Sequence, residues 1–236
     1  MIFMGQATVF PIGKGRAVSF AARILEQKGV RVVEAMGKSV THVLLDVPTK
    51  EAELSEIPTG VTIIGGNLDA IEDGYTKIDL LREEQYLSEN AAITADCALR
   101  LLGDRLPVAF RGCPILVIGW GRIGKCLAYM LKALDADVSV AARKPSDLGM
   151  LTAMGYGAVD LREIDPCLYR AIINTAPAEV LAWEGEEACV KIDLASRLGM
   201  AGDNVLWARG LPGKMLPEES GACIARGVLR HLEGSK

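Results

Sequence analysis

The sequence has little histidine and no excess of positive charge. It contains two histidines, and its 26 lysines and arginines are outnumbered by 30 aspartates and glutamates, which gives a formal net charge of −4. A nucleic-acid-binding protein needs a basic face that neutralises phosphates. The charge balance therefore predicts that the protein does not bind nucleic acid.

Long apolar runs are also missing. The sequence has no uncharged apolar stretch of about 18 residues, the length from which a membrane-spanning helix is recognised. The first residues, MIFMGQATVFPIGKG, lack the charged start, apolar run and small-residue cleavage site of a signal peptide. We therefore expect neither a membrane span nor a secretory leader.

The six cysteines do not form a cluster. They are widely spaced and no group of histidines accompanies them, so the pattern fits neither a zinc site nor a disulfide framework. Most lie in apolar runs, where a thiol behaves as a small core residue. We expect reduced thiols, no metal site and a cytoplasmic protein. The cysteines are Cys97, Cys113, Cys126, Cys167, Cys189 and Cys223.

The second half of the chain alternates strands and helices. Residues 114–119 (PILVIG) predict a buried strand, residues 123–134 a helix with one apolar face, and residues 137–142 (DVSVAA) a second strand. Two strands joined in this way by a helix should be parallel. The other elements predicted here are a helix at 146–154 capped by Ser146, strands at 170–174, 190–194 and 204–207, and a final amphipathic helix at 219–232.

The first half has a similar but less regular pattern. A helix is predicted at 16–28, and Gly29 is a typical C-cap residue. A long helix at 90–102 and a linker at 103–113 lead into the second half. Short strands are predicted at 7–10, 31–34, 42–47 and 61–65.

A glycine-rich segment follows the strand at 114–119 and opens the next helix. It fits the pattern G-x-G-x-x-G, which in this context is the fingerprint of a dinucleotide site. The first glycine allows a tight turn, the second lets the backbone approach a pyrophosphate, and the third lets the helix pack closely. The pyrophosphate is expected at the positive end of the helix. The alternative is a glycine-rich turn that binds nothing. The candidate residues are Gly119, Trp120, Gly121, Arg122, Ile123 and Gly124.

The end of the second strand indicates which cofactor is bound. An NAD site usually has a carboxylate about 20 residues after the fingerprint, and none occurs in residues 141–146. Arg143, Lys144 and Ser146 stand there instead, and a guanidinium can bind phosphate through two hydrogen bonds. We therefore favour NADP(H), with NAD(H) possible. The alternative is that both cations are solvated loop charges and the site accepts either cofactor.

Two later strand ends should contribute to the same site, because ligands bind at the carboxyl ends of parallel strands. The first follows the strand at 170–174 and the second follows the strand at 190–194. For the first of these segments the alternative is ordinary turn chemistry. The candidate cofactor-binding residues are Asn174, Thr175, Ala176, Pro177, Asp193 and Ala195.

These observations predict an α/β protein with two α/β domains. The C-terminal domain is expected to be a Rossmann-type doubly wound parallel sheet. The expected parts are a small N-terminal α/β domain at 1–88, a connecting helix and linker at 89–110, an NAD(P)-binding Rossmann domain at 111–218, and a C-terminal helix at 219–236 that packs back toward the N-terminal domain.

Several segments resemble one known family. They are VIGWGRIGKCLAYMLKALDADVSVAARKPSDL, IINTAP, DLASR and ARGLPGKMLPEESG, together with the helix that holds Thr94-Ala95-Asp96. In order and spacing they are similar to the family of the dipicolinate synthase A subunit over roughly residues 88–232, whereas the N-terminal domain matches it poorly. The resemblance implies NAD(P)-dependent oxidation of dihydrodipicolinate to dipicolinate, the calcium-chelating acid of bacterial spores. It also implies the flavodoxin-like dipicolinate synthase B subunit as partner.

A small dicarboxylate substrate needs cations and hydrogen-bond donors, for which we identify four candidates: Thr94, Ser196, Arg197 and Lys214. The alternatives are a structural ion pair for Arg197 and a solvated loop charge for Lys214. No catalytic residue is assigned, and a homo-oligomer is expected.

Two other functions stay open. A D-2-hydroxyacid dehydrogenase-like enzyme would act on another small carboxylic acid, but it typically needs a histidine beside its substrate. The C-terminal segments offer no obvious one. A non-catalytic NADP-binding subunit is the second alternative. It is suggested by departures from the family pattern at residues 198–200, and at 216–219, where two added carboxylates would repel a dicarboxylate unless they face away.

Overall fold

The structure is a computed structural model that describes residues 7–50, 57, 59–72, 74–182 and 189–234. The outermost residues of the predicted N-terminal domain and of the predicted last helix, 1–6 and 235–236, lie outside this part. The chain forms two compact units: unit 1 comprises Met1–Ile93 and Pro212–Lys236, and unit 2 comprises Thr94–Leu211. Helix α2 (Glu84–Gly103) runs from the first into the second. The domain limits expected from the sequence stay predictions.

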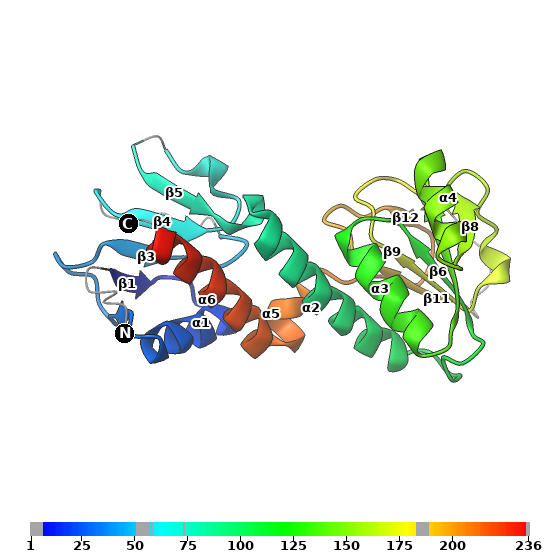
Figure 1. Cartoon of the computed structure of the whole chain (residues 1–236), viewed down its shortest axis with the longest axis horizontal. Helices are drawn as coiled ribbons and strands as arrows, with labels where there is room; N and C mark the ends of the chain where they lie inside the picture. The colour runs from blue at the N-terminus through cyan, green and yellow to red at the C-terminus, as the bar shows by residue number, and fades with distance from the viewer. Residues whose placement is uncertain (1–6, 51–56, 58, 73, 183–188, 235–236) are drawn as a thin grey trace. The chain divides into compact units, whose positions relative to one another are not determined.

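Unit 1 contains a parallel sheet covered by helices. Its strand order is β2-β1-β3-β4-β5, and every neighbouring pair is parallel. Helix α1 (Arg16–Gln27) packs along α6 (Pro217–Gly234), as Figure 1 shows. The short helices η2 (Leu68–Ala70) and η3 (Leu80–Arg82) flank β5. The strands are β1 (Thr8–Pro11), β2 (Arg31–Val32), β3 (His42–Leu44), β4 (Thr62–Gly65) and β5 (Thr76–Asp79).

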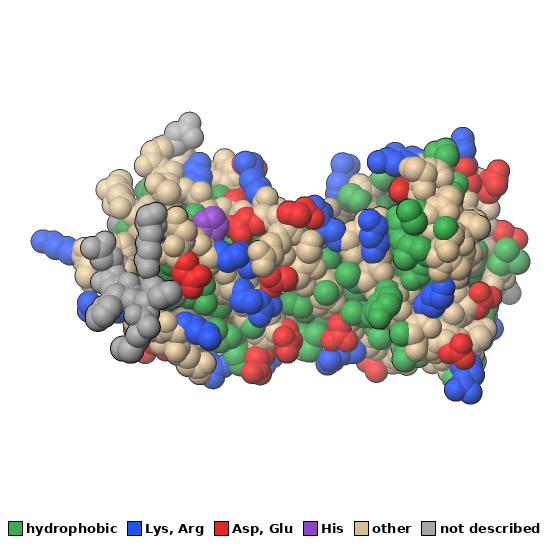
Figure 2. Space-filling view, in the orientation of Figure 1, with side chains coloured by type: hydrophobic (Ala, Val, Ile, Leu, Met, Phe, Trp, Pro, Cys, Tyr) green, Lys and Arg blue, Asp and Glu red, His purple; other side chains and the backbone are tan. Residues whose placement is uncertain are grey.

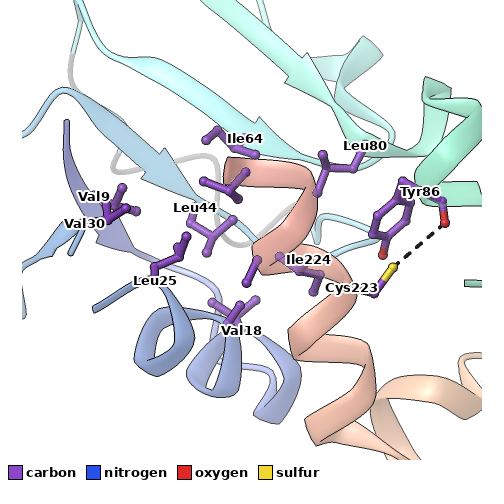
Figure 3. Packing of buried hydrophobic residues seen from close by; sticks show 13 residues of the cluster. Val9, Val18, Leu25, Val30, Leu44, Ile64, Leu80, Tyr86, Cys223 and Ile224 are labelled. Carbon is purple, nitrogen blue, oxygen red and sulfur yellow. Dashed lines mark hydrogen bonds between the residues drawn. The ribbon is translucent and has the colours of Figure 1, made fainter. Parts of the chain in front are cut away.

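The main core of unit 1 joins segments from both ends of the chain. Figure 3 shows Leu44 and Ile64 of the sheet, Val18 of α1 and Ile224 of α6 directed into one cluster. The helices approach closely because Gly221 has no side chain: a Cβ there would lie 2.5 Å from the Cβ of Phe20. The C-terminal helix is therefore part of the unit 1 core.

Unit 2 contains a six-stranded parallel sheet with the order β13-β11-β9-β6-β7-β8. The chain enters at β6, builds one side through β7 and β8, and then builds the other through β9, β11 and β13. This doubly wound topology confirms the predicted fold class. The strands are β6 (Pro114–Ile118), β7 (Asp137–Ala142), β8 (Gly157–Asp160), β9 (Ala171–Asn174), β11 (Val190–Asp193) and β13 (Val205–Trp207).

Four further helices and two short strands belong to the second half. Helix α3 (Arg122–Ala133) contacts β6 and β7, and α4 (Pro145–Ala153) contacts β7 and β8. Residues Ile115 to Ile118 of β6 are all fully buried, as expected for a central parallel strand covered on both faces. The remaining elements are η4 (Pro166–Leu168), β10 (Leu181–Ala182), which pairs with β12 (Met200–Ala201), and α5 (Leu211–Met215).

Two details of the sequence-based prediction are corrected. Ser146 does not cap a helix: α4 begins at Pro145, its N-cap residue is Lys144, and no side chain caps it. Proline is favoured at the first helical position because its fixed φ suits the helix and its missing N–H has no partner there. Strands β5, β8, β10 and β12 were not predicted. Of these, β8 is a short edge strand that is largely accessible to solvent and so carries no apolar run.

All six cysteines are free, and their surroundings differ. Burial raises the pKa of the Cys97 and Cys189 thiols to about 11 and that of Cys223 to about 12. Cys167 is exposed. Because the thiolate is the reactive form, we expect one rapid equivalent with an aromatic disulfide reagent at neutral pH. Cys167→Ser should remove it and Cys126→Ser should leave it; rapid labelling of Cys223 would contradict this assignment.

The surface shows mixed charge, and the described helices are not apolar enough to span a membrane, as expected from the composition. Lys and Arg side chains are interspersed with Asp and Glu side chains on the face shown in Figure 2. Among the helices of the described residues, none combines the length and hydropathy needed to cross a bilayer.

Candidate functional site

The glycine-rich segment forms a tight turn between β6 and α3. Gly119 has φ 102°, and its N–H donates to the Ala141 carbonyl at 2.9 Å. A Cβ on Gly124 would lie 2.0 Å from the Gly119 carbonyl oxygen, so only glycine lets α3 begin this close to the strand. A Cβ on Gly121 would meet nothing within 4 Å, which leaves that backbone open to approach.

The start of α3 suits an anion. Gly121 is its N-cap residue, no side chain caps it, and its first turn contains no acidic residue. The backbone N–H groups of a first helical turn have no partner within the helix, and the helix dipole adds positive potential there. This is the arrangement that binds phosphate groups in dinucleotide-binding folds.

A cavity of about 400 Å³ adjoins this turn at the carboxyl ends of β6, β7 and β9. Its volume lies within the range of small-molecule sites. Most of its wall is apolar, and three charged side chains line it as well. The lining residues are Ile118, Gly119, Trp120, Gly121, Ala141, Ala142, Arg143, Lys144, Asp147, Leu161, Thr175, Ala176, Pro177, Ala178 and Val180.

Only some of the predicted cofactor residues line this cavity. Those that do are Gly119, Trp120, Gly121, Arg143, Lys144, Thr175, Ala176 and Pro177. Those that do not are Arg122, Ile123, Gly124, Ser146, Asn174, Asp193 and Ala195. The lining residues that were not predicted are Ile118, Ala141, Ala142, Asp147, Leu161, Ala178 and Val180. Asp147 directly follows residues 141–146, the segment expected to bear the acidic residue of an NAD site, and Leu161 follows β8, which was not predicted.

The Trp120 ring makes two contacts, one with an aromatic ring and one with a cation. Its ring meets the ring of Tyr156 edge-on at a centroid distance of 5.7 Å. The ammonium group of Lys125 lies 5.7 Å from the Trp120 ring centroid, within reach of a cation–π interaction. The indole thus lines the cavity while it contacts both side chains.

The loop after β9 is fixed to β6 and β11. The N–H and hydroxyl of Thr175 both donate to the Ile118 carbonyl at 2.9 Å. The Asn174 side chain is fully buried and donates to Asp193 at 3.0 Å, while it accepts from the Ala176 N–H at 2.9 Å. Asn174 thus shapes the loop whose next residues line the cavity.

Asp193 is a fully buried carboxylate at the end of β11. It accepts the backbone N–H groups of Ala195, Gly199 and Met200 at 2.9, 2.8 and 3.0 Å. A Cβ on Gly199 would lie 2.3 Å from the Ala178 carbonyl oxygen, so this loop packs directly on the loop after β9. Gly199, in the segment 198–200 that departs from the family pattern, is therefore tightly packed.

The four predicted substrate residues lie in different places, and none lines the cavity. Thr94 is buried on α2, and Ser196 and Arg197 are exposed in the loop after β11. These three belong to unit 2, whereas Lys214 is exposed on α5 in unit 1. Substrate binding by these residues stays a prediction.

The two carboxylates at 218 and 219 have a structural explanation. Glu218 and Glu219 are exposed in the first turn of α6. Negative charge there interacts favourably with the helix dipole, typically by about 0.3–1 kcal/mol at a surface helix. Their presence is accounted for by the stability of α6.

Neither histidine lines the cavity, and both belong to unit 1. His42 lies at the start of β3, where its Nδ1 is 2.8 Å from the Thr41 hydroxyl and burial lowers its pKa. His231 on α6 is hydrogen-bonded through Nε2 to Glu83. The cavity therefore has no imidazole in its wall for proton transfer.

The doubly wound sheet, the glycine turn and the adjoining cavity define a Rossmann-type dinucleotide-binding fold. No family model matches the chain. The chain is similar to the A subunit of dipicolinate synthase from Bacillus subtilis (strain 168), with 27% identity over 205 residues, 76% of this chain and 67% of that protein. This finding confirms the resemblance to that family.

Solved structures agree with this similarity. The A subunit of dipicolinate synthase from Bacillus halodurans has a TM-score of 0.79 at 21% identity, over 97% of this chain and 98% of its own. The transhydrogenase of Sinorhizobium meliloti has a TM-score of 0.73 at 17% identity over 98% and 85% of the two chains. The shared fold thus includes the N-terminal residues, whose sequence matched poorly. Together these similarities support an NAD(P)-dependent oxidoreductase.

Proposed function

We propose that the chain is an oxidoreductase of the same kind as the dipicolinate synthase A subunit, which binds NADP(H) in the unit 2 cavity and oxidises dihydrodipicolinate to dipicolinate. NAD(H) is the second cofactor candidate. The observation that carries the proposal is the glycine turn that opens α3 onto a cavity at the carboxyl edge of a doubly wound sheet.

The cavity chemistry suits the parts of the cofactor. Ala142, Leu161 and Val180 offer apolar surface to an adenine, and the first turn of α3 offers N–H groups to the pyrophosphate. Arg143 and Lys144 offer positive charge to a 2′-phosphate. Within the described part of the chain, no ion pair involves either of them.

The reaction makes modest demands on protein side chains. A hydride leaves a ring carbon of dihydrodipicolinate for the nicotinamide, and one proton leaves the ring, which becomes aromatic. No alcohol has to lose its hydroxyl proton, so a strong general base beside the substrate is not required.

Arg143→Ala tests the cofactor assignment. We expect NADP⁺ binding to weaken about tenfold or more, since hydrogen bonds to charged groups contribute about 1.5–3 kcal/mol, and NAD⁺ binding to change little. Isothermal titration calorimetry with both dinucleotides measures this. Arg111→Ala is the matched control, because Arg111 is exposed before the amino end of β6 and pairs with Asp135 at 3.4 Å. If neither dinucleotide binds the unaltered chain, the proposal is wrong.

A turnover assay tests the reaction itself. The chain would be supplied with NADP⁺ and dihydrodipicolinate, with and without a flavodoxin-like B subunit. The dipicolinate formed would be measured by its ultraviolet absorbance.

We propose that the chain forms a homo-oligomer, works with this partner in the cytoplasm and serves spore formation. The outcome of the turnover assay also decides between the alternative functions. Turnover of another small carboxylic acid alone would favour the D-2-hydroxyacid dehydrogenase-like alternative. Cofactor binding without any turnover would favour a non-catalytic subunit.

A further inference from the structure

The candidate cofactor cavity contains a carboxylate beside its two cations. Asp147 lines the cavity together with Arg143 and Lys144. Asp147 is half-buried, whereas Arg143 and Lys144 are exposed. Ser146, the residue that the sequence suggested for this position, is exposed and lies outside the lining. The structure thus has a negative charge where a neutral hydroxyl was expected.

The helix fixes where this carboxylate lies. Asp147 is in the first turn of α4, and its N–H donates to the Lys144 carbonyl at 3.0 Å. Pro145 precedes it at the first helical position, where a fixed φ limits the backbone. A carboxylate in a first turn is also stabilised by the helix dipole. The helix therefore fixes the backbone position from which the Asp147 side chain reaches the cavity wall.

Asp147 does not form a close ion pair with either neighbouring cation. Within the described residues, no ion pair joins Asp147 to Arg143 or Lys144, although all three line one cavity. Asp147 would thus repel a phosphate that the cations attract. It can also accept hydrogen bonds from ribose hydroxyls, as the acidic residue of NAD-binding sites does.

NADP differs from NAD by one phosphate on the 2′-oxygen of the adenosine ribose, and such a phosphate carries a charge of about −1.5 to −2 at neutral pH. A single nearby carboxylate therefore opposes one dinucleotide more than the other. The cations act in the opposite sense. The opposing charges of Asp147 on one side and of Arg143 and Lys144 on the other would set the selectivity between NADP and NAD.

We propose that Asp147 is a specificity-determining residue that keeps the preference for NADP(H) over NAD(H) below the level that Arg143 and Lys144 alone would give. This inference rests on the proposed function, because it takes dinucleotide binding in this cavity as given. The cavity accepts both dinucleotides, with NADP(H) ahead by a reduced margin.

Asp147→Asn tests the inference, because it removes the charge and nearly keeps the shape. We expect the ratio of the NAD⁺ to the NADP⁺ dissociation constant to rise about threefold to fivefold, as for the loss of one partly screened charge interaction. Calorimetry at low ionic strength measures both constants, and added salt should shrink the change. The matched control is Asp137→Asn, the same charge change at the exposed amino end of β7.

The outcomes separate the two proposals. An unchanged ratio in Asp147→Asn, or binding of only one of the two dinucleotides by the unaltered chain, overturns this inference while the proposed function stands. An equal rise in Asp137→Asn also overturns it, since the effect would then come from net charge. Failure of the unaltered chain to bind either dinucleotide overturns the proposed function and this inference with it.

Discussion

Replacement of Asp193 by alanine is expected to lower the free energy of unfolding by about 4 kcal/mol and to abolish dinucleotide binding. The carboxylate is fully buried and accepts three backbone N–H groups and the Asn174 amide. Without it these donors are left buried with no acceptor at that position, and each such donor costs about 1–3 kcal/mol. The loops after β9 and β11 would separate, and the first of them lines the cavity. Urea denaturation followed by circular dichroism measures the change.

Asp165→Ala is the matched control for this prediction. Asp165 is an exposed aspartate of the same unit that accepts one backbone N–H, from Cys167, at 3.0 Å. Its loss should cost about 1 kcal/mol, as for a helix cap, and leave dinucleotide binding unaltered. Equal stability losses in the two variants would mean that the buried network around Asp193 contributes little.

Gly124→Ala is the second change with a large expected effect. The new Cβ would lie 2.0 Å from the Gly119 carbonyl oxygen and 3.2 Å from the Thr175 hydroxyl, and the first of these is backbone that cannot turn aside. We expect a loss of about 2 kcal/mol in stability from overpacking. We also expect dinucleotide binding to fall about a hundredfold, because the displaced turn loses charge-assisted hydrogen bonds to the pyrophosphate. Thermal unfolding and calorimetry measure the two effects.

Gly149→Ala is the control for the same substitution. Gly149 lies inside α4, and a Cβ there would meet nothing within 4 Å. Alanine should therefore stabilise the helix by about 0.5–1 kcal/mol, the opposite sign from Gly124→Ala. Unweakened dinucleotide binding in Gly124→Ala would show that the turn is not the pyrophosphate site.

Most elements of the Rossmann-type unit could be predicted because their signals are local. The apolar run at 114–119 predicted β6 (Pro114–Ile118), and the one-sided apolar face at 123–134 predicted most of α3. In the other unit, the helix predicted at 16–28 ends before Gly29, as expected. Periodicity and end signals are properties of neighbouring residues, so the sequence carries them without tertiary information.

The sequence could not reveal structural roles that depend on distant partners. Cofactor binding by Asn174 and Asp193 stays a prediction, and the structure shows in addition that both side chains are fully buried and hold loops together. Asn174 and Asp193 are hydrogen-bonded to each other across neighbouring strands, although they lie 19 residues apart in the sequence. No local pattern encodes such a pairing. Ser146 and Asp147 are adjacent, and only the direction of the helix decides that the second of them lines the cavity.

The sequence by itself determined the α/β class, the βαβ order around Gly119 to Gly124 and the presence of cations after β7, because these follow from periodicity, glycine spacing and charge along the chain. Only the tertiary structure decided which polar side chains face the cavity and which are buried beneath its loops. The sequence predicted that the C-terminal helix packs back toward the N-terminal domain, and the tertiary structure decided the detail, namely that α6 packs along α1 with Ile224 in the unit 1 core. The physical reason is that burial and hydrogen bonding are set by contacts between residues distant in the chain, and these exist only once the sheets and helices have packed.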